Sequence, residues 1–424
     1  MTAPRPRLAF VSPSFLFPND TGGRIRTTNI LRGLKGGAFE VTLIGPATAA
    51  QRRDWASQIE GVCDRFVPWE PAPARPRWRR AADLLQEIPV NVAADRTAVG
   101  VQAVRDALAR ERFDCVVFDF VHAAVLRPAA LDLPSVCFTH NVEAEIFARH
   151  IQQAANALLR AMWTSQHAKM LRFERDELRH FTSVVAVSER DAAHFRQRYA
   201  LPRVEAIPTG VDLDFFAWQA PPPVDAAHPP ALAFTGSMDW DANIDGIRFF
   251  LSDVWPRVQA ARPDARFTIV GRHPPAALVE QARALRGVTF TGLVPDVRPY
   301  VRDAQVFVIP LRVGGGTRIK AFEAMAMGCP VVSTAIGIEG LDVRPDDHFL
   351  LADSAADQAA AVLRLLDDGA LRSALSARAR QRVEDQFGHR VAAGVFEQIC
   401  LRAMQAHRAE VEDHRSLAVD ALNA

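Results

Sequence analysis

Residues 308–332 read VIPLRVGGGTRIKAFEAMAMGCPVV, and the order of residue types indicates a strand, a glycine-rich loop and a helix. The apolar run 306–309 is typical of a buried strand, and it ends at Pro310. Three successive glycines, Gly314, Gly315 and Gly316, then expose backbone amides that no side chain covers. A strand followed by such a loop and a helix is the repeating unit of parallel sheets, so this stretch predicts an α/β fold.

The helix of this stretch begins with two cations. Thr317 is the expected N-cap, and Gly328, followed by Pro330, is expected to end the helix. Arg318 and Lys320 fall in the first turn, where the helix dipole disfavours each exposed positive charge by about 0.3–1 kcal/mol. An anion at the helix N-terminus would remove that penalty. The loop amides, the dipole and the two cations together predict a phosphate-binding site.

A simpler interpretation is a solvated turn in which Lys320 and Glu323 form an ordinary ion pair. Lysine is scarce in this chain, because only three of its 50 basic residues are lysines, so the lysine at position 320 favours the phosphate site. The stretch is not a Walker A loop, since no Gly-Lys-Ser/Thr follows four spacer residues.

Length and composition indicate a globular protein. The 424 residues are enough for two domains with good cores, and 49% hydrophobic and 23% charged residues are ordinary values. The net charge of +1 offers no field that would attract nucleic acid, so no nucleic-acid partner is expected. The five cysteines form no Cys-x-x-Cys pair, which favours free thiols in a reducing compartment. No stretch approaches the about 20 apolar residues of a membrane span, and we expect a cytoplasmic protein.

Short apolar runs alternate with helical patterns along the chain, which indicates parallel sheets with crossover helices. In the first half, strands are expected at 8–11, 41–44, 115–118, 135–138, 184–187 and 204–207. Helical patterns cover 24–35, 100–112 and a long stretch from about 143 to 180. The second half has strands expected at 232–235, 267–270, 288–291, 306–309, 331–333 and 349–351.

The proline-rich stretch FAWQAPPPVDAAHPP, residues 216–230, interrupts this alternation. We therefore predict an N-terminal Rossmann-like domain (1–214), a linker (215–230), a C-terminal Rossmann-like domain (231–390) and a C-terminal helix (391–424) that returns to the first domain. Doubly wound sheets bind ligands beyond the carboxyl ends of their strands. The two domains are expected to face each other across a cleft that holds the site.

With these segments in place, the chain resembles the GT-B glycosyltransferases, and in particular the retaining, nucleotide-sugar-dependent group called glycosyltransferase family 4. The resemblance covers most of the chain and is strongest over 205–340. It is carried by IPTGVDLDFF (207–216), LAFTGSMDWDANIDGIRFF (232–250), FTIVGRHP (267–274), VTFTGLVPDVRPYVRDAQVFVIPL (288–311) and GGGTRIKAFEAMAMGCPVVST (314–334). In the first half it rests on TGGRIRTTNIL (21–31), FTHNVEAEIF (138–147) and VVAVSERDAAHF (184–195).

The resemblance implies roles for individual residues. Glu323 would hydrogen-bond the nucleotide ribose, and Arg318 and Lys320 would hold the donor diphosphate as catalytic cations. His140 would lie near the transferred sugar. The glycines that would let backbone approach the donor are Gly22, Gly23, Gly236, Gly314, Gly315 and Gly316, with Thr317 beside them.

Two neighbouring cations repeat the first pattern, because Arg24 and Arg26 follow Gly22 and Gly23 at the start of a helix. Two departures from the family pattern also stand out. The position of the usual first glutamate, eight residues before Glu323, is Gly315. The stretch after the first strand of the second domain, 236–243, contains no cation, which places more of the phosphate binding on Arg318 and Lys320.

Breaking a sugar–nucleotide bond places new negative charge on the diphosphate, which a metal ion or protein cations must stabilise. The chain has two Asp-x-Asp sequences, one at Asp212 and Asp214 and one at Asp239 and Asp241. We interpret Asp241 as a helix cap and Asp212 as a turn residue, so no metal and no cofactor is expected. For His140, a core or capping histidine is the competing interpretation.

The basic stretch RPRWRR, from Arg75 to Arg80, is either a solvated loop or a contact with anionic lipid at the inner face of the cell membrane. The predicted function is transfer of a sugar from a nucleotide-diphosphate sugar to a carbohydrate or lipid-linked acceptor of the cell envelope or an exopolysaccharide. Two alternatives stay open: a degenerate homologue that binds the nucleotide-sugar without transfer, and a sugar-nucleotide epimerase of the same fold. A dinucleotide dehydrogenase is disfavoured because neither opening strand is followed by GxGxxG.

Overall fold

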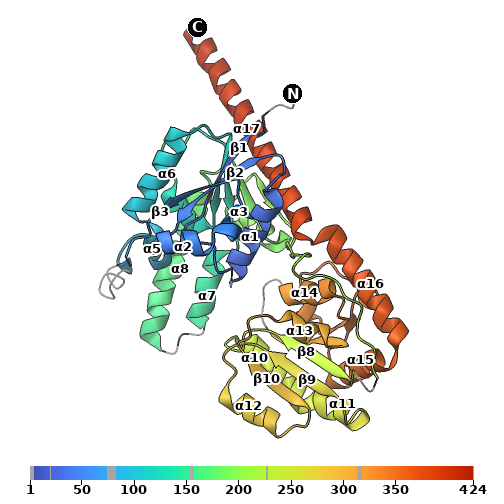
Figure 1. Ribbon diagram of the computed structural model, residues 1–424. Coiled ribbons are helices and arrows are strands. Elements are labelled where there is room, and N and C mark those ends of the chain that lie inside the picture. Colours follow the sequence, from blue (N-terminus) through green and yellow to red (C-terminus); the bar gives the residue numbers. More distant parts are fainter. Residues whose placement is uncertain are drawn as a thin grey trace. The chain divides into compact units, whose positions relative to one another are not determined.

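The computed structural model describes residues 4–19, 21–73, 83–152, 154, 156–225, 228–313 and 318–423, with side chains to Asp413 (Figure 1). The chain divides into two compact units. The first unit comprises Met1–Gly210 and Arg390–Ala424, and the second comprises Val211–His389.

The first unit is built on a parallel sheet that, among the described residues, has seven strands in the order β3-β2-β1-β4-β5-β6-β7. Their bounds are β1 Arg7–Val11, β2 Glu40–Pro46, β3 Arg65–Trp69, β4 Cys115–Asp119, β5 Ser135–Phe138, β6 Ser183–Ala186 and β7 Val204–Ala206. Strand β1 lies between β2 and β4, so the chain reverses its winding direction there. That switch point is where ligands of doubly wound sheets bind.

Side chains of β1 alternate between two apolar cores. Ala9 and Val11 pack on one face, and Leu8 and Phe10 pack on the other. Helices on the first face include α5 (Val90–Asp95), α6 (Ala98–Arg110), α7 (Glu143–Gln152), α8 (Ala157–Leu178) and α9 (Glu189–Arg198). The second face is covered by α1 (Gly22–Leu34), α3 (Ala56–Glu60) and α17 (His389–Asn423). The unit also contains α2 (Ala49–Asp54) and the 3₁₀ helix η1 (Val121–Leu126).

The second unit repeats this architecture with a parallel sheet of six strands, among the described residues, in the order β10-β9-β8-β11-β12-β13. The bounds are β8 Ala231–Thr235, β9 Arg266–Val270, β10 Val288–Gly292, β11 Val306–Ile309, β12 Val331–Ser333 and β13 Leu350–Leu351. Its switch point lies between β8 and β11.

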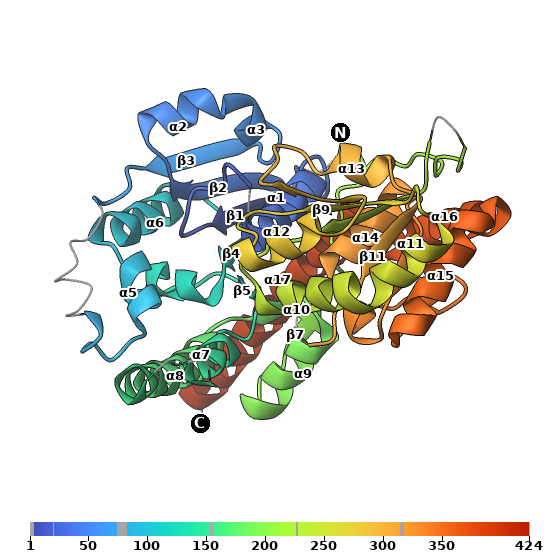
Figure 2. The ribbon, with the colours of Figure 1, turned by 90° about the horizontal axis from the view of Figure 1, so that it is seen from below.

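Helices cover both faces of the second sheet as well (Figure 2). One face packs against α10 (Asp241–Phe249), the π-helical turn η2 (Phe250–Val254), α11 (Trp255–Ala261), α12 (Ala276–Arg283) and α15 (Ala355–Asp367). The other packs against α13 (Arg298–Arg302), α14 (Ile319–Met327) and part of α16 (Gly369–Gln386), near η3 (Ile336–Ile338). The predicted fold class, two Rossmann-like α/β domains followed by C-terminal helices, is confirmed.

Three predictions at the level of elements were wrong. Strand β3 was missed, because Pro68 lies inside it and proline is tolerated only at a sheet edge, which is where β3 lies. The long helix expected from about 143 to 180 is two helices, α7 and α8, and Asn156 caps the second through Leu159 N–H (2.9 Å). Asp241 is not a cap, since it is the first residue of α10 and no side chain caps that helix.

Candidate active site

In the second unit, the start of α14 brings a lysine to the carboxyl end of β8. Lys320 Nζ donates a hydrogen bond to Asn243 Oδ1 (2.9 Å) and lies 4.2 Å from the centre of the Phe234 ring. Asn243 is held in place by its own Nδ2, which donates to the Ser237 carbonyl oxygen (2.7 Å). The ammonium thus contacts one amide oxygen and one aromatic face, and burial lowers the pKa of Lys320 to about 7.

The ion pair between Lys320 and Glu323, which the sequence allowed, does not form between these described residues. The Glu323 carboxylate also accepts no hydrogen bond from any residue that the structure describes. Burial raises the pKa of Glu323 to about 7, and the lysine only partly opposes that shift. One turn of helix therefore holds a cation and a carboxyl group that are both costly to ionise without a further partner.

Arg318 lies just before α14, which begins at Ile319, so it precedes the first turn in which it was expected. Its side chain is buried, with Nε donating to the Ile336 carbonyl oxygen (3.3 Å) and the guanidinium 5.9 Å from the Trp240 ring. Burial lowers the pKa of Arg318, and Glu339 opposes the shift. The helix ends, as predicted, at Gly328, which has the left-handed φ of 86°.

Gly236 leaves the space that Lys320 occupies. A Cβ at this position would lie 2.6 Å from Lys320 Nζ and 2.8 Å from Asn243 Nδ2, so any side chain would displace both groups. Residues 236–243 contain no cation of their own, and Lys320 of α14 places its ammonium beside them instead. The other predicted donor-binding residues of this loop, Gly314, Gly315, Gly316 and Thr317, lie outside the described residues.

In the first unit, a buried carboxylate ends β4 at the switch point. Asp119 is fully buried and accepts hydrogen bonds from Ser12 Oγ (3.2 Å), Thr27 Oγ1 (3.0 Å) and His140 Nε2 (2.8 Å). These donors come from the segment after β1, from α1 and from the segment after β5. Asp119 was not predicted as a site residue, although an acidic residue directly after the apolar run CVVF was a signal.

The hydrogen bond to Asp119 fixes the tautomer of His140, because the nitrogen facing a carboxylate must carry the proton. The other nitrogen, Nδ1, is buried and has no hydrogen-bond partner among the described residues. Burial lowers the pKa of His140, with Asp119 opposing, so the ring is neutral near pH 7. His140 therefore presents an unprotonated acceptor nitrogen, which a core or capping histidine would be expected to satisfy.

The Phe120 ring stacks on His140, with ring centres 3.9 Å apart and planes inclined by 19°. Phe120 has φ 67° and ψ 148°, a backbone conformation that is costly for any residue except glycine. A Cβ on Gly23 would lie 2.5 Å from Phe120 Cζ, whereas a Cβ on Gly22 would meet nothing within 4 Å. The Phe120 ring leaves no room for a side chain at position 23, so Gly23 is required for packing. At Gly22 the space is free, so only there can a ligand approach the start of the helix.

Replacing Gly23 with alanine is expected to displace Phe120 and to lower the free energy of unfolding by about 1–3 kcal/mol. Chemical denaturation measures the change. Gly22→Ala is the matched control, since it adds the same methyl group where space is open. Equal stability of the two variants would contradict the packing role of Gly23.

The two arginines that follow these glycines differ in their surroundings. Arg24 Nη1 donates to the Pro18 carbonyl oxygen (3.3 Å). Arg26 is buried, and burial lowers its pKa to about 10, with Asp191 opposing the shift. Gly22, Gly23 and His140 thus belong to the first unit, and Gly236, Arg318, Lys320 and Glu323 to the second.

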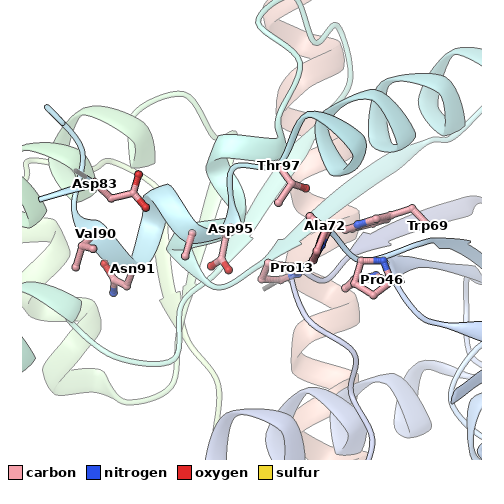
Figure 3. A pocket seen from close by; sticks show the side chains of 12 residues that line it. Pro13, Pro46, Trp69, Ala72, Asp83, Val90, Asn91, Asp95 and Thr97 are labelled. Carbon is pink, nitrogen blue, oxygen red and sulfur yellow. The ribbon is translucent and has the colours of Figure 1, made fainter. Parts of the chain in front are cut away.

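A pocket with a volume of about 430 Å³ opens at the carboxyl ends of β1, β2 and β3 in the first unit (Figure 3). Its apolar wall contains Trp69, Val90 and the prolines Pro13, Pro46, Pro71 and Pro73. Its polar groups include Asp83, Asn91, Asp95 and Thr97. An apolar wall combined with a few carboxylates and an amide is suited to a hydroxylated ligand.

His122 fixes the carboxylate side of this pocket. Its Nδ1 lies 3.6 Å from Asp95 Oδ2, and its Nε2 lies 3.5 Å from Glu143 Oε2. Burial alone would lower the pKa of His122, but hydrogen bonds with the two carboxylates outweigh it and raise the pKa to about 9. The imidazolium orients Asp95, which lines the pocket. The sequence analysis missed His122 and Asp95.

The two Asp-x-Asp sequences have separate surroundings. Asp212 Oδ1 accepts the N–H groups of Asp214 (3.1 Å) and Phe215 (2.9 Å), which confirms the turn predicted there. One ligand atom each from Asp212, Asp214 and His389 lie within 4.8 Å of one another. The His389 N–H donates to the Val211 carbonyl oxygen (2.8 Å), and this bond joins the last and first residues of the second unit. Asp239 accepts the Ser237 hydroxyl (2.6 Å).

Comparison with known proteins identifies the class. Residues 21–215 match the family model described as Glycosyltransferase Family 4, and residues 229–368 match the one described as Glycosyl transferases group 1. The chain belongs to this group of GT-B glycosyltransferases, as its sequence resemblance predicted. Among the described residues, no helix has the length and apolar character that crossing a membrane requires.

Individual proteins are similar to the chain over different shares of its length. A phosphatidyl-myo-inositol mannosyltransferase of Mycolicibacterium smegmatis is 32% identical over 185 residues, 42% of this chain and 46% of that protein. The match thus spans about half the length of that relative. An uncharacterized 44.6 kDa protein in the cps region of Klebsiella pneumoniae is 20% identical over 82% of this chain and 87% of its own length. Sucrose-phosphate synthase of Thermosynechococcus elongatus has the same fold, with a TM-score of 0.62, 19% identity, and coverage of 96% of this chain and 100% of that one.

Proposed function

We propose that this protein transfers a sugar from a nucleotide-diphosphate sugar to an acceptor of the cell envelope or of an exopolysaccharide, with retention of configuration and without a metal ion. The observation that carries the proposal is the state of Lys320. Its side chain is half-buried, its ammonium contacts Asn243 and the Phe234 ring, and no described residue pairs with the nearby Glu323. Such a site is stabilised when an anion binds.

Lys320 and Arg318 would neutralise the diphosphate as the sugar–phosphate bond breaks. Both side chains are fixed by protein contacts before the donor binds, so little reorganisation accompanies the reaction. A preorganised contact of this kind typically contributes roughly 3–4 kcal/mol to transition-state stabilisation. Glu323, on the same helix, would accept hydrogen bonds from the ribose hydroxyls. Gly236 would keep the approach to Lys320 open.

His140 would act on the sugar side. Its buried Nδ1 is an unused acceptor, which suits a hydroxyl of the transferred sugar or of the acceptor. Asp119 acts as a positioning residue, because it holds the ring through Nε2 and keeps the proton there. Gly22 would allow the ligand to approach the start of α1.

The first unit, which we take to be the acceptor side, would bind the acceptor in the pocket beside Trp69. Asp95, oriented by His122, would receive hydroxyl groups of a carbohydrate, and the apolar wall would pack on its ring. The names of the mannosyltransferase and of the capsule-region relative support an envelope or polysaccharide acceptor. The stretch from Arg75 to Arg80, interpreted above as a loop or a lipid contact, lies outside the described residues.

A panel of UDP- and GDP-sugars, with release of free nucleotide as the readout, tests the proposal. We expect release with one donor only, accelerated by an acceptor and unchanged by EDTA. Nucleotide-sugar binding without release would instead indicate a degenerate homologue, and conversion of one nucleotide-sugar into another without an acceptor would indicate an epimerase. Loss of release in EDTA that manganese restores would contradict the metal-independent mechanism.

A further inference from the structure

Helices α7 and α8 form a hairpin that begins three residues after His140 and projects from the rest of the first unit. The two helices lie side by side in both views (Figures 1 and 2). Glu143 N–H, at the start of α7, donates to Glu174 Oε1 (2.7 Å), and this contact marks the base of the hairpin. From Glu174 back to Leu158 the helix is about 24 Å long, at 1.5 Å per residue. The hairpin therefore extends well beyond the carboxyl ends of the strands, where His140 lies.

The far half of this hairpin exposes apolar side chains. Leu158 is 81% exposed and Leu159 is 38% exposed, both in the first turn of α8. Leu85, which is 88% exposed, belongs to a segment fastened to the same helix, because the Leu84 carbonyl oxygen accepts from Lys169 Nζ (2.7 Å). Positions 158 and 169 fall on the same side of α8, about 16 Å apart along its axis, so Leu158 and the segment that carries Leu85 lie on one side of the helix, and Leu159 follows Leu158 in the same turn. Exposed leucines grouped in this way indicate an interaction surface.

Charge on the hairpin identifies the partner. Residues 146–173 contain no Asp or Glu, although the whole chain has 49 acidic residues, and they include Arg149, Arg160, Lys169 and Arg172. Arg149 and Arg160 are exposed and form no ion pair with a described residue. One exposed carboxylate, Glu87, lies two residues from Leu85. Leucines beside unpaired arginines match an anionic bilayer, whose headgroups attract the cations and whose acyl region accepts the leucines.

We infer that the outer half of the α7–α8 hairpin, residues 146–152 and 156–173 together with Leu85, docks on an anionic membrane surface. The contact is peripheral, with Leu158, Leu159 and Leu85 inserted at the level of the acyl boundary and the arginines on lipid phosphates. The hairpin projects from the carboxyl ends of the strands, where His140 lies. The acceptor pocket is attached to the same hairpin, because Val90, which lines the pocket, donates its N–H to Gln166 Oε1 of α8 (2.9 Å). The docked orientation would thus place this pocket near the lipid.

Flotation of the full chain with vesicles tests the inference. Vesicles of phosphatidylcholine alone are compared with vesicles that also contain phosphatidylglycerol, at low and high salt. The chain should bind the anionic vesicles only, and high salt should weaken the binding. Leu158→Asn combined with Leu159→Asn should lower the affinity at least about tenfold. Arg149→Gln and Arg160→Gln should each lower it about fivefold.

Matched controls use equally exposed residues elsewhere. Leu293→Asn changes a leucine that is 79% exposed in the second unit, and Arg105→Gln changes an exposed arginine of α6, and both should bind as the parent protein does. Nucleotide binding and circular dichroism, unchanged in all variants, show that they are folded. Equal binding to neutral vesicles, no binding, or unaltered binding of the leucine and arginine variants would overturn the inference. A self-association that the leucine changes abolish would assign the surface to a second copy instead.

Discussion

Replacing Lys320 with methionine should lower kcat/KM about 100- to 1000-fold, which is the usual effect of removing one preorganised charge contact. Nucleotide-diphosphate affinity should fall as well, because the phosphate loses a cation that the protein holds in place through Asn243. Steady-state kinetics and calorimetry measure the two effects. Lys35→Met is the control: it makes the same chemical change at an exposed lysine of the first unit, whose Nζ donates to the Glu60 carbonyl oxygen.

The Lys320→Met variant should be more heat-stable than the parent protein at pH 6. Burial lowers the pKa of Lys320 from 10.5 to about 7, so between these values the unfolded chain binds more protons, and stability rises with pH. Below pH 7 the half-buried ammonium is charged, and the full cost of removing it from water is present. In the variant, Glu323 loses the nearby cation, but its pKa of about 7 means that it is mostly protonated at pH 6. Its carboxyl group therefore adds no comparable cost of a buried charge. Unchanged kinetics together with lower stability would mean that Lys320 is a structural residue.

Binding of a diphosphate should also take up a proton near neutral pH. The anion raises the pKa of Lys320 from about 7, so the bound state holds a proton that the free state has partly lost. Affinity should therefore fall as pH rises above 7. This pH dependence should be absent from the Lys320→Met variant, which separates a lysine that binds phosphate from one that only supports the fold.

Replacing Asp119 with asparagine should lower kcat about 100-fold, the upper end of the effect seen when a residue that orients a functional group is lost. The amide would turn an N–H₂ group toward Ser12, Thr27 or His140, all of which now donate to the carboxylate. His140 would lose the partner that keeps its proton on Nε2. The free energy of unfolding should fall by about 1–3 kcal/mol, since a buried polar group is left mismatched.

Nitrogen chemical shifts of His140 distinguish positioning from general destabilisation. The parent protein should show the Nε2–H tautomer, and the Asp119→Asn variant should show a changed or mixed tautomer. Asp132→Asn is the control, because the side chain of Asp132 is 95% exposed. A variant with full activity and an unchanged tautomer would remove Asp119 from the site.

Much of the fold could be read from the sequence because buried parallel strands appear as continuous apolar runs. The runs at 135–138, 306–309 and 331–333 are strands with the same bounds in the structure. Strand β3 was lost because Pro68 interrupts its apolar pattern. The break between α7 and α8 was lost because residues around 152–157 favour helix, and Asn156 was the one capping signal.

The site was predicted less completely, because its contacts join residues that are distant in the chain. Thr27 and Asp119 are 92 positions apart, and Lys320 and Asn243 are 77 apart. Neither contact leaves a local pattern. Local signals such as glycines, cations at a helix start and EAMAMG did indicate α14 and the segment around Gly22. They did not distinguish Gly22, beside which the space is free, from Gly23, beside which the Phe120 ring fills the space.

A crystal structure of the protein with the nucleoside diphosphate of its donor would decide where the leaving group binds. We predict that Lys320 Nζ lies within about 3 Å of a phosphate oxygen, with Arg318 on the same group and Glu323 at the ribose. A diphosphate bound away from Lys320 and Arg318, or bound through a metal ion at Asp212 or Asp239, would contradict this prediction.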